Sequence, residues 1–191
     1  MSGILEPIKG ASYKTMVDLT KVDGDRNEAI MFVTAYTDET NFTGAELENG
    51  AVVVLDELMS DGSWVAKAPV AVTDDIYFHC SVEVDYDERV VSKEEFSLKA
   101  ATVSDELKGR VKKLRSGNRV TMSTNGLSTY VKGTSKYVFV EAGTTKLKAD
   151  AAMPETNGLV FKIIDEDVTI GFNERPAVLL HCLGSVTKPA V

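Results

Sequence analysis

The sequence predicts an all-β fold, a sandwich or barrel of short antiparallel strands. Apolar and polar residues alternate with a period of two in many short segments, which is typical of strands with one buried face. The stretches between these segments are rich in turn-forming residues, and they read STNG, KGTS, EAGTT, PETNG and FNERP. Many short strands divided by such turns favour a sandwich or a barrel.

The expected strands follow one another along most of the chain. In residues 12–20, Tyr13, Val17 and Leu19 share one face. Residues 29–36 are apolar on both faces, as in a strand covered on both sides. Asn49-Gly50 is a strong turn signal before the valine-rich segment 51–58. Further strands are expected at 63–67, 76–86, 119–123, 136–141, 158–165 and 177–183.

One stretch, SDELKGRVKKLRSG (104–117), departs from the strand pattern. Its Leu107, Val111 and Leu114 have helical spacing, and Ser104 is a suitable N-cap. Gly109 costs about 1 kcal/mol relative to alanine inside a helix, which weakens this interpretation. The residues alone leave a short helix open here.

Length, charge and cysteine content limit the domain organisation and the classes of function that the sequence allows. The 191 residues fit one β-rich domain (1–191), with 1–45 as an N-terminal extension or additional strands and 185–191 as a flexible tail. A net charge of −8 argues against a protein whose whole surface binds nucleic acid or anionic membrane. We expect no signal peptide and no membrane span, and the two distant cysteines are expected to be free thiols in a reducing compartment.

All the histidines and cysteines lie in two tetrapeptides, YFHC (77–80) and LLHC (179–182). Adjacent residues on a strand point to opposite faces, so the four side chains do not converge as a tetrahedral metal site requires. The pattern predicts Cys80 on an apolar face and His79 on a polar one. On the second strand it places His181 with Leu179 and Leu183, and Cys182 on the opposite face with Val178 and Leu180. We expect no metal, although a Cys-His nucleophile formed across strands stays open.

Motifs for known reactions and cofactors are missing from the sequence. It has no phosphate-binding loop, dinucleotide fingerprint, nucleophile elbow or HExxH motif. We therefore expect no enzyme, no catalytic residues and no cofactor. The alternative is a β-fold hydrolase, which requires His79, His181 and carboxylates such as Asp74-Asp75 or Asp165–Asp167 to meet in one cleft.

A run of basic residues stands out in this acidic chain. It comprises six cations within twelve positions: Lys108, Arg110, Lys112, Lys113, Arg115 and Arg119. Such a run can be a solvated face, a docking patch for an acidic protein, or a nucleic-acid contact. Aromatic residues, which single-strand binding sites interleave with cations, are missing from the run. The run is therefore interpreted as a candidate protein-contact site, with nucleic acid disfavoured.

Several segments between residues 45 and 183 resemble a family of small virion proteins of tailed bacteriophages. They are LENGAVVVLDELMSDGSWVAKAP (47–69), DDIYFHCSVEVDYDERVVSKEEF (74–96), KKLRSGNRVTMS (112–123), AGTTKLKADA (142–151) and GLVFKIID (158–165). The resemblance implies a capsid decoration or capsid-associated protein with no cofactor and no reaction. It further implies that LRSGN lies in an extended arm or a hairpin turn, in conflict with a helix at 112–117.

From this resemblance we expect a structural virion protein that binds the outer surface of a phage capsid and stabilises the shell. Its implied partners are the major capsid protein and further copies of itself, with no membrane involved. The implied location is the capsid surface of a virion made in the host bacterial cytoplasm. A tail-tube or head–tail connecting subunit is the alternative within the same class, because those proteins also use β-sandwiches of this size.

Overall fold

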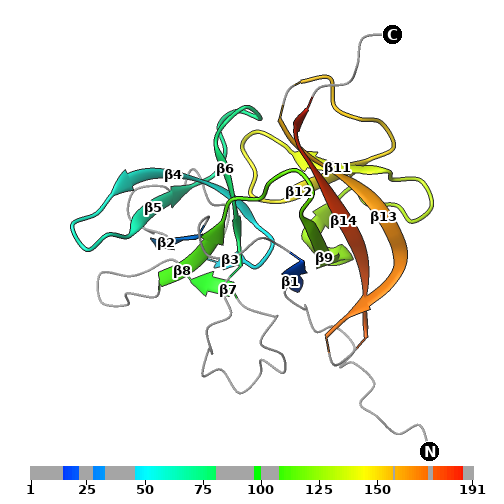
Figure 1. Cartoon of the computed structure of the whole chain (residues 1–191), viewed down its shortest axis with the longest axis horizontal. Coiled ribbons are helices and arrows are strands. Elements are labelled where there is room, and N and C mark those ends of the chain that lie inside the picture. The colour runs from blue at the N-terminus through cyan, green and yellow to red at the C-terminus, as the bar shows by residue number, and fades with distance from the viewer. Residues whose placement is uncertain are drawn as a thin grey trace, which may run out of the picture.

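The strands of this protein form two units that pack against each other (Figure 1). The computed structural model describes residues 15–21, 28–32, 46–80, 97–99, 108–156, 158–171 and 174–186. Within these ranges the chain is all-β, with one short 3-10 turn and no α-helix, which confirms the predicted fold class. Neither unit therefore offers, in the described part of the chain, a helix long and apolar enough to cross a membrane.

The first unit is a seven-stranded sheet. From edge to edge it consists of β1 (Val17–Lys21), β9 (Arg119–Ser123), β14 (Arg175–Val186), β13 (Gly158–Ile170), β11 (Tyr137–Val140), β12 (Leu147–Asp150) and β10 (Leu127–Ser128). All neighbours pair antiparallel except β10 and β12. The hairpin of β13 and β14 is its longest part, and register shifts that indicate bulges interrupt this pairing.

The second unit is a small closed barrel. Its order is β2 (Glu28–Phe32), β5 (Trp64–Lys67), β4 (Val52–Leu58), β6 (Ile76–His79) and β8 (Lys108–Lys112). The ring closes through the parallel pair of β2 and β5 and the antiparallel pair of β2 and β8. A two-stranded ribbon of β3 (Glu46–Glu48) and β7 (Ser97–Lys99) accompanies the barrel.

One apolar core joins the two units. From the barrel, Val52, Ile76 and Phe78 enter it with their outward-facing side chains. From the sheet it receives a set of residues that are almost fully buried: Val120, Met122, Val138, Val140, Leu147, Ala149, Phe161, Val178, Leu180 and Cys182. The outer wall of the barrel thus covers the inner face of the sheet, and both faces of the barrel wall are buried along this contact.

The barrel interior is a second and smaller cluster. It contains Val53, Ala66 and Val111, and Leu47 of β3 packs into the same cluster. Along β4, Val52 belongs to the shared core while Val53 belongs to the interior, as the period-two geometry of a strand requires. The run of valines in the sequence is explained by this double burial.

The N-terminal strand is held in a tight slot. Met16 is 1% exposed, its N–H donates to Ser123 Oγ over 2.7 Å, and its carbonyl accepts from Ser123 N over 2.9 Å. Thr15 donates from its backbone N and from Oγ1 to Glu48 Oε2, over 3.0 and 2.6 Å. A Cβ added at Gly126 would stand 2.3 Å from Thr15 Cγ2, so only glycine leaves room here. Residues 15–21 are therefore integral to the sheet.

The structure reproduces most of the expected strands. Segments 51–58, 63–67, 119–123, 136–141, 158–165 and 177–183 correspond to β4, β5, β9, β11, β13 and β14. The first halves of 29–36 and 76–86 correspond to β2 and β6, while 33–36 and 81–86 lie outside the described residues. Short strands β3, β7, β10 and β12 were not predicted, and β13 and β14 are longer than expected.

Of the two alternatives for 104–117, a short helix or an extended arm, the helix is wrong for the residues that the structure describes, and residues 108–112 are extended. Residues 108–112 form β8, which pairs antiparallel with both β2 and β6. Val111 points into the barrel interior and Leu114 into the shared core. The two residues resemble one helical face in the sequence, but they pack into separate clusters. Gly109 and the β-branched Val111 also favour a strand over a helix. Residues 104–107 lie outside the described ranges.

Replacing Phe78 with alanine tests whether the two units share one core. Phe78 is 1% exposed and lies in the cluster that both units contribute to, so we expect Phe78→Ala to lower the free energy of unfolding by about 3–5 kcal/mol. Val131→Ala is the control, because Val131 is 56% exposed and its truncation should change stability by less than about 0.5 kcal/mol. Urea titrations followed by Trp64 fluorescence and by circular dichroism should coincide in both variants. Separate transitions for barrel and sheet would contradict the shared core.

Candidate protein-contact surface

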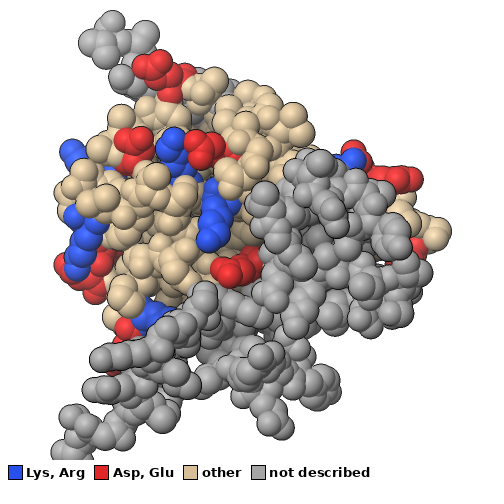
Figure 2. Space-filling view, turned by 180° about the vertical axis from the view of Figure 1, so that it is seen from behind, with Lys and Arg blue, Asp and Glu red and all other residues tan. Residues whose placement is uncertain are grey.

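The structure places the predicted basic run on both units. Lys108, Arg110 and Lys112 belong to β8 of the barrel, Lys113 and Arg115 lie in the connection, and Arg119 begins β9 of the sheet. The run therefore follows the crossover between the units rather than one strand face. On the side of the molecule turned to the viewer in Figure 2, basic and acidic side chains are interspersed rather than gathered in one patch.

The six cations differ in their surroundings. Lys113 Nζ lies 2.5 Å from Asp75 Oδ1 and 5.6 Å from the centroid of the Tyr77 ring. The ion pair and the cation–π contact both hold the Lys113 side chain in place. Arg110, Arg115 and Arg119 have exposed side chains. Among the cations of the run whose side chains the structure describes, the three arginines are the most exposed.

A rigid turn presents Arg115. The backbone N–H of Arg115 donates to Asn118 Oδ1 over 2.8 Å, and Asn118 N donates to the Arg115 carbonyl over 3.0 Å. Gly117 has a φ of 96°, which favours glycine, and its N–H donates to the Cys182 carbonyl over 2.9 Å. LRSGN thus forms a turn, but this turn joins the barrel to the sheet rather than two strands of a hairpin.

The loop between β5 and β6 carries the most exposed large apolar residue of the described chain. Val70 is 80% exposed. Asp74 Oδ2 accepts from the backbone N–H groups of Val70 and Ala71, over 2.9 and 2.8 Å. The loop is also tied to the sheet, because Gly143 N donates to the Pro69 carbonyl over 2.7 Å. We call residues 69–74 the Val70 loop.

His79 lies inside the barrel, so the prediction that it occupies a polar face is wrong. It is fully buried and stands opposite Val111 in the pairing of β6 with β8. Its Nδ1 lies 2.9 Å from the Glu48 carbonyl oxygen, which makes Nδ1 the protonated donor of the neutral ring. Desolvation lowers the pKa of His79 to about 4, an effect that the hydrogen bond to Glu48 opposes. The ring is a neutral structural element of the barrel.

Cys80 and Cys182 are buried as predicted, and His181 and Cys182 lie on opposite faces of β14, as the strand pattern requires. Cys80 and Cys182 are free, buried thiols in the shared core, and burial raises the pKa of the Cys182 thiol. His181 is half-buried on the opposite, outer face of β14, between Arg119 and Lys162 in the cross-strand register. His79 and His181 therefore belong to different faces of different units and do not converge.

The carboxylates at 165–167 hold a neighbouring loop. Glu166 accepts from the Tyr130 hydroxyl over 3.2 Å and from Gly133 N over 2.9 Å, and Lys132 Nζ lies 2.6 Å from Asp167 Oδ1. Partial desolvation and the charge of Glu166 raise the pKa of Tyr130 to about 12. Among the described residues, no group of three or more histidines, cysteines or carboxylates is placed to hold a metal ion.

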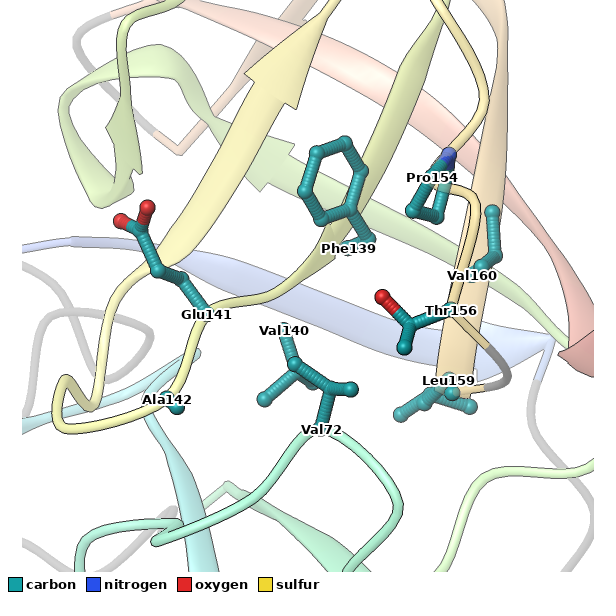
Figure 3. A pocket seen from close by; sticks show the side chains of 10 residues that line it. Val72, Phe139, Val140, Glu141, Ala142, Pro154, Thr156, Leu159 and Val160 are labelled. Carbon is teal, nitrogen blue, oxygen red and sulfur yellow. The ribbon is translucent and has the colours of Figure 1, made fainter. Parts of the chain in front are cut away.

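A small hollow of about 190 Å³ opens where the sheet meets the Val70 loop (Figure 3). Its lining is mostly apolar and includes Val72, Phe139, Pro154 and Leu159. The carboxylate of Glu141 turns away from the apolar side chains in Figure 3, and its Oε1 lies 2.9 Å from Lys148 Nζ. The Thr156 hydroxyl is the remaining side-chain polar group of the lining. This arrangement contains no acid–base pair.

Comparison of the chain with protein-family models, with curated proteins and with solved structures finds no match. The surfaces described above thus have to be interpreted from their own geometry. The sequence pointed to the arginines through their density, but it gave no signal for the Val70 loop. A valine between proline and alanine looks like any core residue until its exposure is known.

The buried His79 makes stability depend on pH. Its pKa falls from 6.5 in the unfolded chain to about 4 in the folded one. Between these pH values the unfolded state binds a proton that the folded state does not, so stability decreases as the pH falls from about 6.5 toward 4, by about 3 kcal/mol in total. Denaturant titrations across this range should show the loss, and His79→Gln should remove this contribution. His181→Gln is the matched control and should retain it; an unchanged slope in His79→Gln would contradict the assignment.

The buried thiols should be unreactive in the native protein. Cys80 is 7% exposed and Cys182 is 0% exposed, so a thiol reagent such as Ellman's compound should react with neither until the chain unfolds. The reaction in denaturant should then release two equivalents, matching the two cysteines of the sequence. Rapid reaction of one thiol under native conditions would instead support the Cys-His nucleophile.

Proposed function

We propose that this protein is a structural virion protein that binds the outer surface of a bacteriophage capsid and stabilises the assembled shell. Its partner is the major capsid protein, and its location is the surface of a virion made in the bacterial cytoplasm. It carries out no reaction and holds no cofactor. The proposal rests on the sequence resemblance to phage virion proteins and on one structural observation.

That observation is the pre-organised Val70 loop. An exposed apolar side chain on a mobile loop loses entropy when it is bound, whereas here Asp74 and the tie to Gly143 already hold the loop. Apolar anchors of this kind supply much of the binding energy at protein interfaces. The loop lies at the AP exit of the segment that resembles the virion family. It supports a protein contact rather than a small-molecule site.

The exposed arginines supply the second part of the contact. Arg110 and Arg115 lie on the barrel strand β8 and on the rigid turn that follows it. Cations at the rim of an interface mainly affect association rate and selectivity, and salt screens them. Binding to the capsid should therefore have an apolar component from Val70 and a salt-sensitive component from the arginines.

Shell stabilisation follows from preferential binding. A ligand that binds the assembled capsid and not free subunits adds RT ln(1 + [L]/Kd) at each site. Because a capsid repeats the same site many times, a modest affinity at each position accumulates over the shell. A rigid all-β protein with a shared core loses little freedom when it binds, which favours this role.

Co-sedimentation with empty heads of the corresponding phage tests the proposal. We expect the pelleted protein to saturate at a stoichiometry tied to the number of capsomers. Val70→Asp should lower the affinity about tenfold or more, because it places an unpaired charge in an apolar contact. Val131→Asp is the matched control, since Val131 is exposed on a loop that the proposal leaves unused. Charge reversal at Arg110 and Arg115 should weaken binding most at low salt.

The outcomes separate the alternatives. Saturable binding that is lost in Val70→Asp and kept in Val131→Asp supports a decoration protein that docks through the Val70 loop. Binding to isolated tails in place of heads would replace the capsid by the tail as the site of action. The absence of binding to either particle would overturn the structural assignment.

A further inference from the structure

A row of basic residues crosses the outer face of the seven-stranded sheet. Arg119 of β9 stands opposite His181 of β14, which in turn stands opposite Lys162 of β13. Side chains that are directly opposed in a sheet project from the same face. Arg119 and Lys162 are both exposed, and Lys21 holds the register position beyond Arg119 on β1. We call Arg119, His181 and Lys162 the basic row.

The basic row is poorly compensated within the sheet. In the described part of the chain, neither Arg119 nor Lys162 has an ion pair, and the buried Nδ1 of His181 lacks a hydrogen-bond partner. Arg119 and Lys162 lie on the two strands that flank β14, with His181 between them. Both exposed cations are therefore available to an anionic partner.

Apolar side chains surround the basic row. Leu179 and Leu183 lie two positions on either side of His181 and are half-buried on the same face. Ile164 follows Lys162 by two residues and is 47% exposed. Asp165 stands opposite Leu179, so one carboxylate also projects from this face. A partner that fits the two cations and their apolar surroundings combines exposed apolar side chains with carboxylates.

The hairpin tip between β4 and β5 has that chemistry. Leu58 and Met59 are 55% and 39% exposed, and three carboxylates flank them. We call Asp56, Glu57, Leu58, Met59 and Asp61 the acidic tip. One of its carboxylates is paired, because Lys67 Nζ lies 2.5 Å from Asp56 Oδ2, while the side chain of Glu57 is exposed.

The acidic tip is also rigid. Asp61 Oδ1 accepts from Ser63 N over 2.9 Å, and Met59 N donates to the Ser63 carbonyl over 2.8 Å. Gly62 completes the turn with a φ of 84°. In Figure 1 the tip of β4 and β5 lies at one end of the long axis, and the β13–β14 hairpin lies at the other. The tip therefore cannot reach the basic row of its own chain.

We propose that the acidic tip of one copy docks on the basic row of a second copy. The two surfaces are different and lie at opposite ends, so the contact is head-to-tail and continues into a ring or a chain. A second copy is favoured over another acidic partner because one chain carries both complementary surfaces. With a net charge of −8, copies repel each other in most orientations. The basic row provides the orientation in which they attract. This contact stands apart from the Val70 loop and does not depend on capsid binding.

Sedimentation velocity over a range of protein concentrations tests the contact. The wild-type sedimentation coefficient should rise with concentration, and added salt should weaken the rise. The tip variant Glu57→Lys/Leu58→Ser and the row variant Arg119→Glu/Lys162→Glu should each raise the self-association Kd about tenfold or more. Val131→Ser is the control and should behave as wild type. Thermal melts followed by circular dichroism verify that each variant is folded. If the Arg119→Glu/Lys162→Glu variant loses its cooperative transition, Lys162→Ser replaces it as the row variant.

Mixing the two variants gives the decisive result. The tip variant keeps an intact row and the row variant keeps an intact tip, so the mixture should form a heterodimer although each variant alone stays monomeric. Cross-linking through introduced cysteines tests the same contact. The disulfide between Glu57→Cys in one copy and Lys162→Cys in another should form in higher yield than the disulfide between Glu57→Cys and Lys146→Cys. Wild type that stays monomeric at every concentration, or variants that associate as well as wild type, would overturn the proposal.

Discussion

The packing of the barrel wall on the inner face of the seven-stranded sheet is the interaction on which this structure depends. The side chains of Val52, Ile76 and Phe78 point outward from the barrel wall and pack against the inner face of the sheet. The barrel interior is a small cluster, and without the barrel wall the inner face of the sheet would be open to water. The two units are therefore one structure, and the surfaces they carry have a fixed relation.

The connections between the units reinforce that relation. The crossover from β8 to β9 is tied to β14 by hydrogen bonds in both directions between residues 117–118 and Cys182. The loop after β5 is tied to the sheet through Pro69 and Gly143. Arg115 and Val70 are thus displayed by backbone that the shared core already orders. This rigidity supports the proposed role in binding, since little conformational freedom is left to lose.

The polar groups considered for chemistry lie apart from one another in the described part of the chain. His79 is a neutral ring inside the barrel, His181 lies on the outer sheet face, and Glu166 holds a loop. What the surface offers instead is apolar side chains on rigid turns, at Val70 and at Leu58. The proposed contact with a shell uses the Val70 loop, Arg110 and Arg115, whereas the proposed contact between copies uses the acidic tip and the basic row, so the two proposals rest on different residues.

By itself, the sequence determined the all-β class, most strand positions and the burial of Cys80 and Cys182, because the period-two pattern is local and one face of each strand is apolar. It also located the exposed arginines. The sequence did not predict the strand at 108–112. Val111 and Leu114 have the spacing of one helical face, but in the structure they pack into two different clusters. Only the tertiary structure put His79 inside a barrel, left Val70 in solvent and aligned Arg119 with Lys162 across β14. These features depend on which strands become neighbours, and that is decided by packing between residues far apart in the chain.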